Sequence, residues 1–433
     1  MPIHYERNLI EAGHYDVAVV GSGPAGICAA VAAARQGMKT VIIERCGVLG
    51  GMLTVGNVGP ILGNVAPGTM YDELSKKLLT ESGMLHPHVV HDMEHAKKVI
   101  LDFVCDAGVD VLEQTDVVDT IVEENVLTGI IISWKGQISA ITADRFIDAT
   151  GDGNVAFEAG VPWKIGRESD GKLQPVTLMY IVQNVDESQA ITCFGEDDEV
   201  KIGNRKFLEF TQECVNKGIL PKNCYCVRLY RTTHSGERLV NTSQVNDIDP
   251  LDPRQCVKAE KELRRQEIMI TEFLRKYVPG FSKCTIKIGA STLGIRESRR
   301  IVGEYILNIQ DLRSARKFPD VVVHNACFVV DIHNPDGGGQ QEGVAEAVRP
   351  YDIPYRCLVP LEIENLIIAG RCISSTHEAQ ASFRVMSICM AIGEAAGIAA
   401  AQSILNSVTP RKLKPELIQQ ELMTKGAVLF DEQ

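Results

Sequence analysis

The chain has 433 residues, of which 45% are hydrophobic and 23% are charged, a composition ordinary for a globular enzyme. Its formal net charge is −12, which argues against nucleic acid or an anionic membrane surface as a main partner, because both require a basic surface. The length allows two or three domains.

Three features of the sequence indicate in which cellular compartment the protein is expected. Residues 1–15 are charged and contain no apolar core, so they are not a signal peptide. The thirteen cysteines include no C-x-x-C pair and no spacing typical of zinc or iron–sulfur ligands. Segment 385–405 is apolar but contains Glu394, which favours a buried helix over a membrane span. We therefore expect a cytoplasmic protein with reduced thiols and no bound metal.

The strongest signal is a βαβ pattern at 16–44. A short apolar run leads into Gly21, Gly23 and Gly26 at the G-x-G-x-x-G spacing, and a second apolar run ends before Glu44. The glycines permit a tight turn, close approach of a pyrophosphate, and close packing of helix on strand. An acid at the position of Glu44 accepts hydrogen bonds from a ribose. The pattern predicts that the chain binds a dinucleotide, either NAD or FAD. The alternative is that the glycines form a turn in an ordinary βαβ unit.

Periodicity predicts the elements that follow. Helices are expected at about 70–82 and 92–107. Short apolar runs with polar breaks at 109–148 indicate an antiparallel meander followed by a buried strand. A long amphipathic helix is expected at about 252–278, between strand-like runs. No second G-x-G-x-x-G motif occurs, so the sequence offers no separate domain for NAD(P)H.

These patterns predict an α/β protein built from a Rossmann-like domain with a β-meander and an inserted α+β domain. The first part of the Rossmann-like domain is expected at 1–165 and the inserted substrate or cap domain at 166–345. The chain then returns to the first domain at 346–433, with a buried helix at 385–405 and a short surface helix in the tail.

Two later strand ends indicate which dinucleotide is bound. The first is I-D-A-T-G-D-G at 147–153, and the second is L-I-I-A-G-R at 366–371. Together with Gly50-Gly51-Met52, they resemble the FAD-dependent oxidoreductases of the glutathione-reductase superfamily. The segments at 294–305, 331–339, 353–360 and 369–397 narrow the resemblance to single-nucleotide FAD-dependent oxidoreductases, which are distantly similar to fumarate reductase and GidA-type flavoproteins.

The resemblance implies that the cofactor is FAD and that residues from both ends of the chain hold it. Carried over position by position, the residues that would contact FAD are Gly21, Ser22, Gly23, Ala25, Gly26, Glu44, Arg45, Gly50, Gly51, Met52, Thr54, Val118, Ala149, Gly151, Asp152, Gly370, Arg371, Val385 and Met386. Arg45 and Val118 would lie beside the adenine. The helix that opens near Val385 would point its positive end at the flavin ring.

Four residues are candidates for catalysis or substrate binding. His377 and Arg384 bracket the loop expected over the flavin, and His333 lies in the turn-rich segment at 331–339. A histidine can act as a base at neutral pH, and an arginine can bind a carboxylate. Arg296 belongs to a dense charged run. Three of them have a stated alternative role: a backbone hydrogen bond for His333, contact with the cofactor for Arg384, and a solvated face or ion-pair network for Arg296.

The sequence predicts an FAD-dependent dehydrogenase or oxidase that transfers a hydride from a small organic substrate to flavin N5. The alternatives are a flavin-dependent isomerase or hydratase without net redox change, a tRNA-modifying flavoprotein, and a nucleotide sensor. The electron acceptor is open among oxygen, a quinone and a protein carrier. No nucleic acid or membrane partner is expected, and a homodimer is the default oligomeric state.

Overall fold

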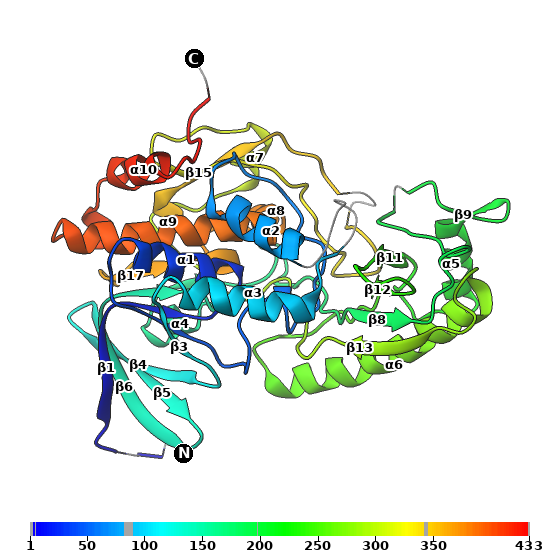
Figure 1. Ribbon diagram of the computed structural model, residues 1–433, viewed down its shortest axis with the longest axis horizontal. Helices are drawn as coiled ribbons and strands as arrows, with labels where there is room; N and C mark the ends of the chain where they lie inside the picture. The colour runs from blue at the N-terminus through cyan, green and yellow to red at the C-terminus, as the bar shows by residue number, and fades with distance from the viewer. Residues whose placement is uncertain (1–2, 5, 82–89, 197, 342–344, 432–433) are drawn as a thin grey trace.

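A seven-stranded sheet forms the centre of the larger domain in the computed structural model, which describes residues 3–4, 6–81, 90–196, 198–341 and 345–431 (Figure 1). The strands follow the order β3–β2–β1–β6–β5–β4, and β17 also pairs with β6. Their bounds are β1 (Ile10–Val20), β2 (Thr40–Ile43), β3 (Asp110–Leu112), β4 (Asp116–Glu123), β5 (Val126–Trp134), β6 (Gln137–Asp148) and β17 (Leu366–Ile368). Strands β1, β2, β3, β6 and β17 run parallel to one another. Strands β4, β5 and β6 pair in the antiparallel fashion predicted for the meander.

Strand β6 serves two purposes along its length. Its first half pairs with β5 in the meander, and its second half is the predicted buried strand, lying between β1 and β17. In this register Asp148 is level with Val20 of β1 and with Ile368 of β17. The carboxyl ends of three strands from distant parts of the chain therefore meet at one edge, which is where open α/β sheets bind ligands.

Helices α1 (Pro24–Arg35) and α9 (Met386–Leu405) pack against each other along the sheet (Figure 1). A Cβ atom on Gly393 would lie 2.0 Å from the Ala25 carbonyl oxygen, and one on Gly397 would lie 2.2 Å from that of Ala29. Only glycine fits at such contacts. Helix α9 is long and apolar enough to cross a membrane, but 83% of its most apolar window is buried inside the protein, as predicted for a core helix.

The smaller domain is an antiparallel sheet in the order β11–β12–β8–β13 with its own core. Its strands are β8 (Tyr180–Gln183), β11 (Arg228–Arg231), β12 (Arg238–Asn241) and β13 (Thr285–Gly289), and its helices are α5 (Phe207–Asn216) and α6 (Pro253–Tyr277). Tyr180 and Val182 of β8 pack with Phe273 and Leu274 of α6. The α+β character and the long helix agree with the sequence prediction, as do α2 (Met70–Glu81) and α3 (Met93–Cys105).

The structure differs from the predicted boundaries in two places. Ile301, Phe318 and Val323 pack in the core of the larger domain, so the chain returns there well before 346. Strand β15 (Val321–Ala326) then pairs with β16 (Tyr351–Pro354) across a long loop. Strand β1 begins at Ile10 because its exposed first half extends the pairing with β6. The tail helix α10 (Pro415–Thr424) is the predicted surface helix, and it buries Ile418 and Leu422 on its inner face.

Candidate active site

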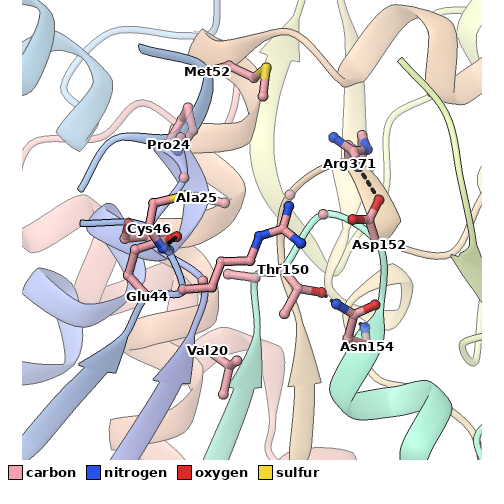
Figure 2. A pocket seen from close by; sticks show the side chains of 18 of the residues that line it. Val20, Pro24, Ala25, Glu44, Cys46, Met52, Thr150, Asp152, Asn154 and Arg371 are labelled. Carbon is pink, nitrogen blue, oxygen red and sulfur yellow. Dashed lines mark hydrogen bonds and ion pairs between the residues drawn. The ribbon is translucent and has the colours of Figure 1, made fainter. Parts of the chain in front are cut away.

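A deep cleft lies at the sheet edge where β1, β6 and β17 end (Figure 2). It encloses about 1210 Å³ of empty space, including the part open to solvent. The walls come from the turn after β1, the loop after β2, the turn after β6, the turn after β17 and the start of α9. The fold thus brings the N-terminal and C-terminal motifs to one cavity.

Most residues predicted to contact the cofactor line this cleft. They are Gly21, Ser22, Gly23, Ala25, Glu44, Arg45, Gly51, Met52, Ala149, Gly151, Asp152, Gly370, Arg371 and Met386, and they are joined by Arg384. Five lie outside the lining: Gly26, Gly50, Thr54, Val118 and Val385. Thr54 is buried behind the wall, where its hydroxyl donates to the Leu49 carbonyl at 2.7 Å.

The three glycines of the fingerprint have different surroundings. Gly21 has φ +93°, and a Cβ on Gly26 would lie 1.8 Å from the Gly21 carbonyl oxygen, so these two build the turn and the helix contact. Gly23 is different, because a Cβ there would have no heavy atom within 4 Å. The space in front of Gly23 belongs to the cleft, and it is where a pyrophosphate would approach the backbone.

Glu44 is buried and already bonded on both carboxylate oxygens. Its Oε2 accepts from the Ser22 backbone N–H at 2.9 Å and from the Ser22 hydroxyl at 2.6 Å, and its Oε1 accepts from the Cys46 N–H at 2.7 Å. A carboxylate has about four acceptor sites, so about one is left for a ribose hydroxyl. The protein bonds fix the side chain at the mouth of the dinucleotide turn.

Asp152 and Arg371 form an ion pair in the lining of the cleft (Figure 2). Arg371 donates to Asp152 Oδ1, which also accepts from the Ser298 hydroxyl at 2.6 Å. Burial by itself raises the pKa of Asp152, but Arg371 and Ser298 outweigh it, so the pKa is lowered and the carboxylate stays charged. The buried Nε of Arg371 has no hydrogen-bond partner in the described part of the chain.

These observations fit a dinucleotide cofactor. The cleft offers a glycine cradle at Gly23, an acid at Glu44 and, at Arg371, a cation with an unsatisfied N–H. The N-termini of α1 and α9 both reach the lining, at Pro24 and Met386, and helix N-termini favour negative charge. The thiols of Cys46 and Cys389 also line the cleft; burial raises their pKa values to about 11 and about 12, so neither is a thiolate at neutral pH.

The other residues that line the cleft were not among the predicted cofactor contacts. The additional residues are Val20, Pro24, Ile43, Cys46, Val55, Thr115, Asp116, Val117, Thr150, Asn154, Thr292, Leu293, Ile295 and Cys389. Beside the predicted position Val118, which is 48% exposed, the cleft is lined by Val117 and the two residues before it. The segment from Thr292 to Ile295 follows the smaller domain's last strand, and nothing in its composition marks it as part of the site.

Three of the four candidate catalytic residues, Arg384, His333 and Arg296, lie near one another. Arg384 lines the cleft and donates to Asp331 Oδ2 at 3.1 Å, and His333 Nε2 lies 3.5 Å from the same oxygen. Burial and the charge of Arg296 lower the pKa of His333 to about 4, so the imidazole is neutral at neutral pH. Burial, with the nearby Arg384, also lowers the pKa of Arg296 to about 9.

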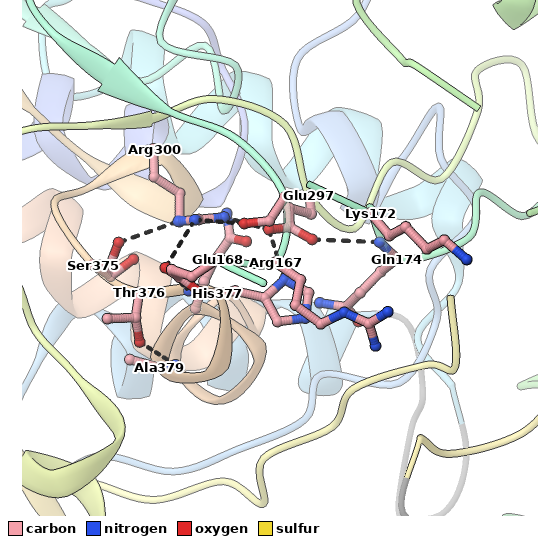
Figure 3. A network of polar contacts seen from close by, with 12 residues as sticks. Arg167, Glu168, Lys172, Gln174, Glu297, Arg300, Ser375, Thr376, His377 and Ala379 are labelled. Carbon is pink, nitrogen blue, oxygen red and sulfur yellow. Dashed lines mark hydrogen bonds and ion pairs between the residues drawn. The ribbon is translucent and has the colours of Figure 1, made fainter. Parts of the chain in front are cut away.

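His377 does not lie over the cleft, and this corrects the expectation from its loop. It begins helix α8 (His377–Phe383) and is fully buried in an ion-pair network, shown in Figure 3. Its Nδ1 lies 2.9 Å from Glu297 Oε1, which also accepts from Arg300. Arg300 further donates to the Gly166 carbonyl at 2.8 Å. Part of the charged run at 296–300 is therefore a structural network, the alternative considered from the sequence.

Removing Glu297 should destabilise the fold strongly. Arg300 is only 1% exposed, so the variant Glu297→Ala leaves its charge buried without its main partner. We expect a loss of about 3–5 kcal/mol in the free energy of unfolding, measured by urea denaturation. The control Glu262→Ala breaks an exposed pair with Arg265 and should cost less than about 1 kcal/mol. Equal losses in the two variants would contradict a structural role for the buried network.

Among curated proteins, the chain is 30% identical over 162 residues to the thiamine thiazole synthase of Pyrococcus horikoshii, a match that covers 34% of this chain and 62% of that one. The chain thus spans less than two thirds of that relative's length. It is 38% identical over 94 residues to the mitochondrial dihydrolipoyl dehydrogenase of Schizosaccharomyces pombe, covering 22% of this chain and 15% of that one.

Similar solved structures include a geranylgeranyl bacteriochlorophyll reductase-like protein from Thermoplasma acidophilum, with a TM-score of 0.47 and 16% identity over 96% of this chain and 84% of that one. A flavin-dependent brominase has a TM-score of 0.47 and 12% identity over 95% and 83% of the two chains.

The sequence pattern of one family covers almost the whole chain. It is described as FAD dependent oxidoreductase and matches residues 16–422, which include both strand-end motifs and the start of α9. The protein therefore is an enzyme and binds FAD. It belongs to the FAD dependent oxidoreductase family.

Proposed function

We propose that the protein is a dehydrogenase or oxidase that acts on a small organic substrate bound between the cleft and the smaller domain. The observation that carries the proposal is the position of Arg384, which lines the FAD cleft and at the same time bonds to Asp331 beside His333. A neutral histidine thus lies one contact away from the cleft. The strand-end motifs at 147–153 and 366–371 support a place in the glutathione-reductase superfamily.

FAD, when bound, takes up two electrons as a hydride. Oxidation of a C–OH or C–N bond also releases a proton, and the proposed acceptor is the neutral imidazole of His333. Asp331 lies beside that imidazole and stabilises its protonated form once the proton has moved. Arg384 lines the cleft and bonds to both the backbone carbonyl and the carboxylate of Asp331, so it links this pair to the cleft.

Anaerobic mixing of the FAD-loaded protein with a substrate panel tests this proposal. The panel contains hydroxy acids, amino acids, polyols and sugars, and the measurement is loss of the visible flavin absorbance. We expect at least one class to bleach the flavin. Conversion of a compound with no bleaching would instead support isomerase or hydratase chemistry, and no reaction with any class would contradict the proposal.

The pH dependence should report the low pKa of His333. If its neutral form is the base, the second-order rate constant for flavin reduction falls only as the pH falls through about 4, because burial and the nearby Arg296 and Arg228 hold the pKa of His333 there. An ordinary histidine would give a midpoint near 6.5. Anaerobic stopped-flow absorbance over a pH series measures this rate. A midpoint near 6.5 would contradict the assignment of His333.

A further inference from the structure

Three arginines from separate parts of the chain meet where the smaller domain reaches the FAD cleft. Arg228 begins β11, Arg296 follows β13, and Arg384 follows α8. We call these three residues the arginine cluster. Arg296 and Arg384 contact adjacent residues, since Arg296 donates to the Pro175 carbonyl at 2.6 Å and Arg384 lies 3.5 Å from Gln174 Oε1. In agreement with this, both Arg384 and Arg228 lower the pKa of Arg296. Arg384 lines the cleft, as does Ile295 next to Arg296, so the cluster adjoins the cofactor site.

Two arginines of the cluster are paired with carboxylates and the third is not. Arg228 donates to both oxygens of Glu196, at 2.9 and 2.7 Å, and Arg384 donates to Asp331 at 3.1 Å. Arg296 donates only to the Pro175 carbonyl, at 2.6 Å, and no carboxylate of the described residues lies within ion-pair distance of it. With three guanidiniums, two carboxylates and a neutral His333, one positive charge is left over.

The uncompensated charge of the Arg296 guanidinium would be stabilised by a bound anion. Removing an arginine from water is unfavourable by several kcal/mol unless an opposite charge compensates, and arginine does not lose its proton at neutral pH. The paired side chains nearby are mostly buried: Arg228 is 12% exposed, Arg384 13% and His333 9%. Arg296 itself is only partly buried, so the cluster is not closed to solvent.

Two buried glutamines beside the cluster add unsatisfied polar atoms of both kinds. Gln174 Oε1 accepts from the backbone N–H of His333 at 3.2 Å and from Arg384 at 3.5 Å, and its Nε2 has no partner among the described residues. Gln340 donates to Asp331 at 2.6 Å through Nε2, and its Oε1 is likewise unpartnered in the described chain. Both residues are more than nine-tenths buried. Such atoms normally have a partner, here one that supplies both an acceptor and a donor.

We propose that the arginine cluster binds the carboxylate of a small organic acid, with Arg296 as its counter-ion. This inference rests on the proposed function and deepens it, because it names the chemical class of the substrate. One carboxylate matches the single uncompensated charge, whereas a phosphate would bring more negative charge than the cluster balances. A polar group on the neighbouring carbon, such as a hydroxyl, could then bond to the free atoms of Gln174 and Gln340.

Binding of non-oxidisable probes to the FAD-loaded protein tests the proposal without relying on turnover. The probes are acetate, propionate and benzoate, each compared with its amide, and the readouts are the ligand-induced shift of the oxidised flavin spectrum and the ligand-induced rise in Tm. We expect at least one carboxylate to bind and its amide to bind at least about tenfold more weakly. Absence of binding by every carboxylate, or equal binding of acid and amide, overturns the proposal.

Variants of Arg296 locate the site. Arg296→Gln removes the charge and should raise the Kd of the bound carboxylate about 10- to 100-fold without changing the FAD content, while Arg296→Lys should retain part of the affinity. The control Arg265→Gln changes an exposed arginine on α6 and should leave the Kd unchanged. An unchanged Kd in Arg296→Gln overturns the assignment. If that variant does not fold, the comparison of acids with amides in the wild-type protein still decides.

The test separates this inference from the proposed function. Carboxylate binding that depends on Arg296, with no flavin bleaching by any compound, would support the anion site and contradict the oxidoreductase proposal. Bleaching by neutral polyols or sugars, together with no carboxylate binding, would support the oxidoreductase proposal and contradict the anion site.

Discussion

The variant Gly23→Val should fold like the wild-type protein and be purified without FAD. A Cβ at Gly23 has no heavy atom within 4 Å, and the backbone there has φ −65°, which valine adopts without strain. The added methyl groups would instead fill the space in front of the helix N-terminus that a pyrophosphate needs. We expect FAD affinity to fall by about 100-fold or more, which corresponds to about 2.7 kcal/mol.

Visible absorbance of the purified variant and fluorescence titration with added FAD measure this loss. Gly23→Ala should have an intermediate affinity, because it adds one methyl group. Gly26→Val serves as the contrast, since its side chain would collide with the Gly21 carbonyl and should impair folding itself. A Gly23→Val protein that binds FAD with wild-type affinity would show that the cofactor does not approach this backbone.

Replacing His333 by glutamine should leave FAD bound but slow its reduction by substrate. Glutamine retains a polar side chain in the contact with Asp331, but it cannot accept a proton at neutral pH. General base catalysis typically contributes about 10²- to 10⁴-fold, and we expect a loss of that size in the rate of anaerobic flavin bleaching. The FAD content, measured from the oxidised spectrum, should stay at the wild-type level.

Two further histidine variants act as controls for this prediction. His234 is exposed and paired with Asp92, so His234→Gln should bleach at the wild-type rate. His377→Gln should lower stability, because His377 is buried against Glu297, but should retain substrate-dependent bleaching. Wild-type bleaching in His333→Gln would contradict the assignment of His333 as the base. Loss of bleaching in a stable His377→Gln protein would contradict a purely structural role for His377.

The convergence of the predicted cofactor motifs on one cleft could be foreseen because each of the motifs is local in sequence. The turn at Gly21, the acid at Glu44 and the strand ends at 147–153 and 366–371 each depend on a few consecutive residues. Parallel strands then bring their carboxyl ends to one edge without further information, as the register of Val20, Asp148 and Ile368 shows.

The rest of the site depends on tertiary packing that no short pattern records. His377 and His333 both occur in loops rich in small and polar residues, yet one is enclosed by Glu297 and Arg300 and the other lies near the cleft wall. Arg228 lies near Arg296, and Gln174 bonds to the backbone of His333, only through contacts between segments that are distant in sequence. The sequence also does not indicate that the chain re-enters the larger domain by Ile301, because the residues that pack around Ile301 are distant in sequence.

Arg384 connects the two halves of the site. It lies between α8 and α9 and lines the cofactor cleft. It also bonds to Asp331, which lies beside His333. Substrate and cofactor would therefore meet beside it, with Met386 at the start of α9 on the cofactor side and Arg296 on the substrate side.

A crystal structure of the FAD-loaded protein with the tightest-binding carboxylate probe would test this arrangement most directly. We expect the pyrophosphate against Gly23, the adenosine ribose near Glu44, the flavin ring beside Met52 and Met386, and the carboxylate within hydrogen-bond distance of Arg296. A dinucleotide that runs in the opposite direction, with its adenine beside Arg384, or a carboxylate bound away from the arginine cluster, would contradict it.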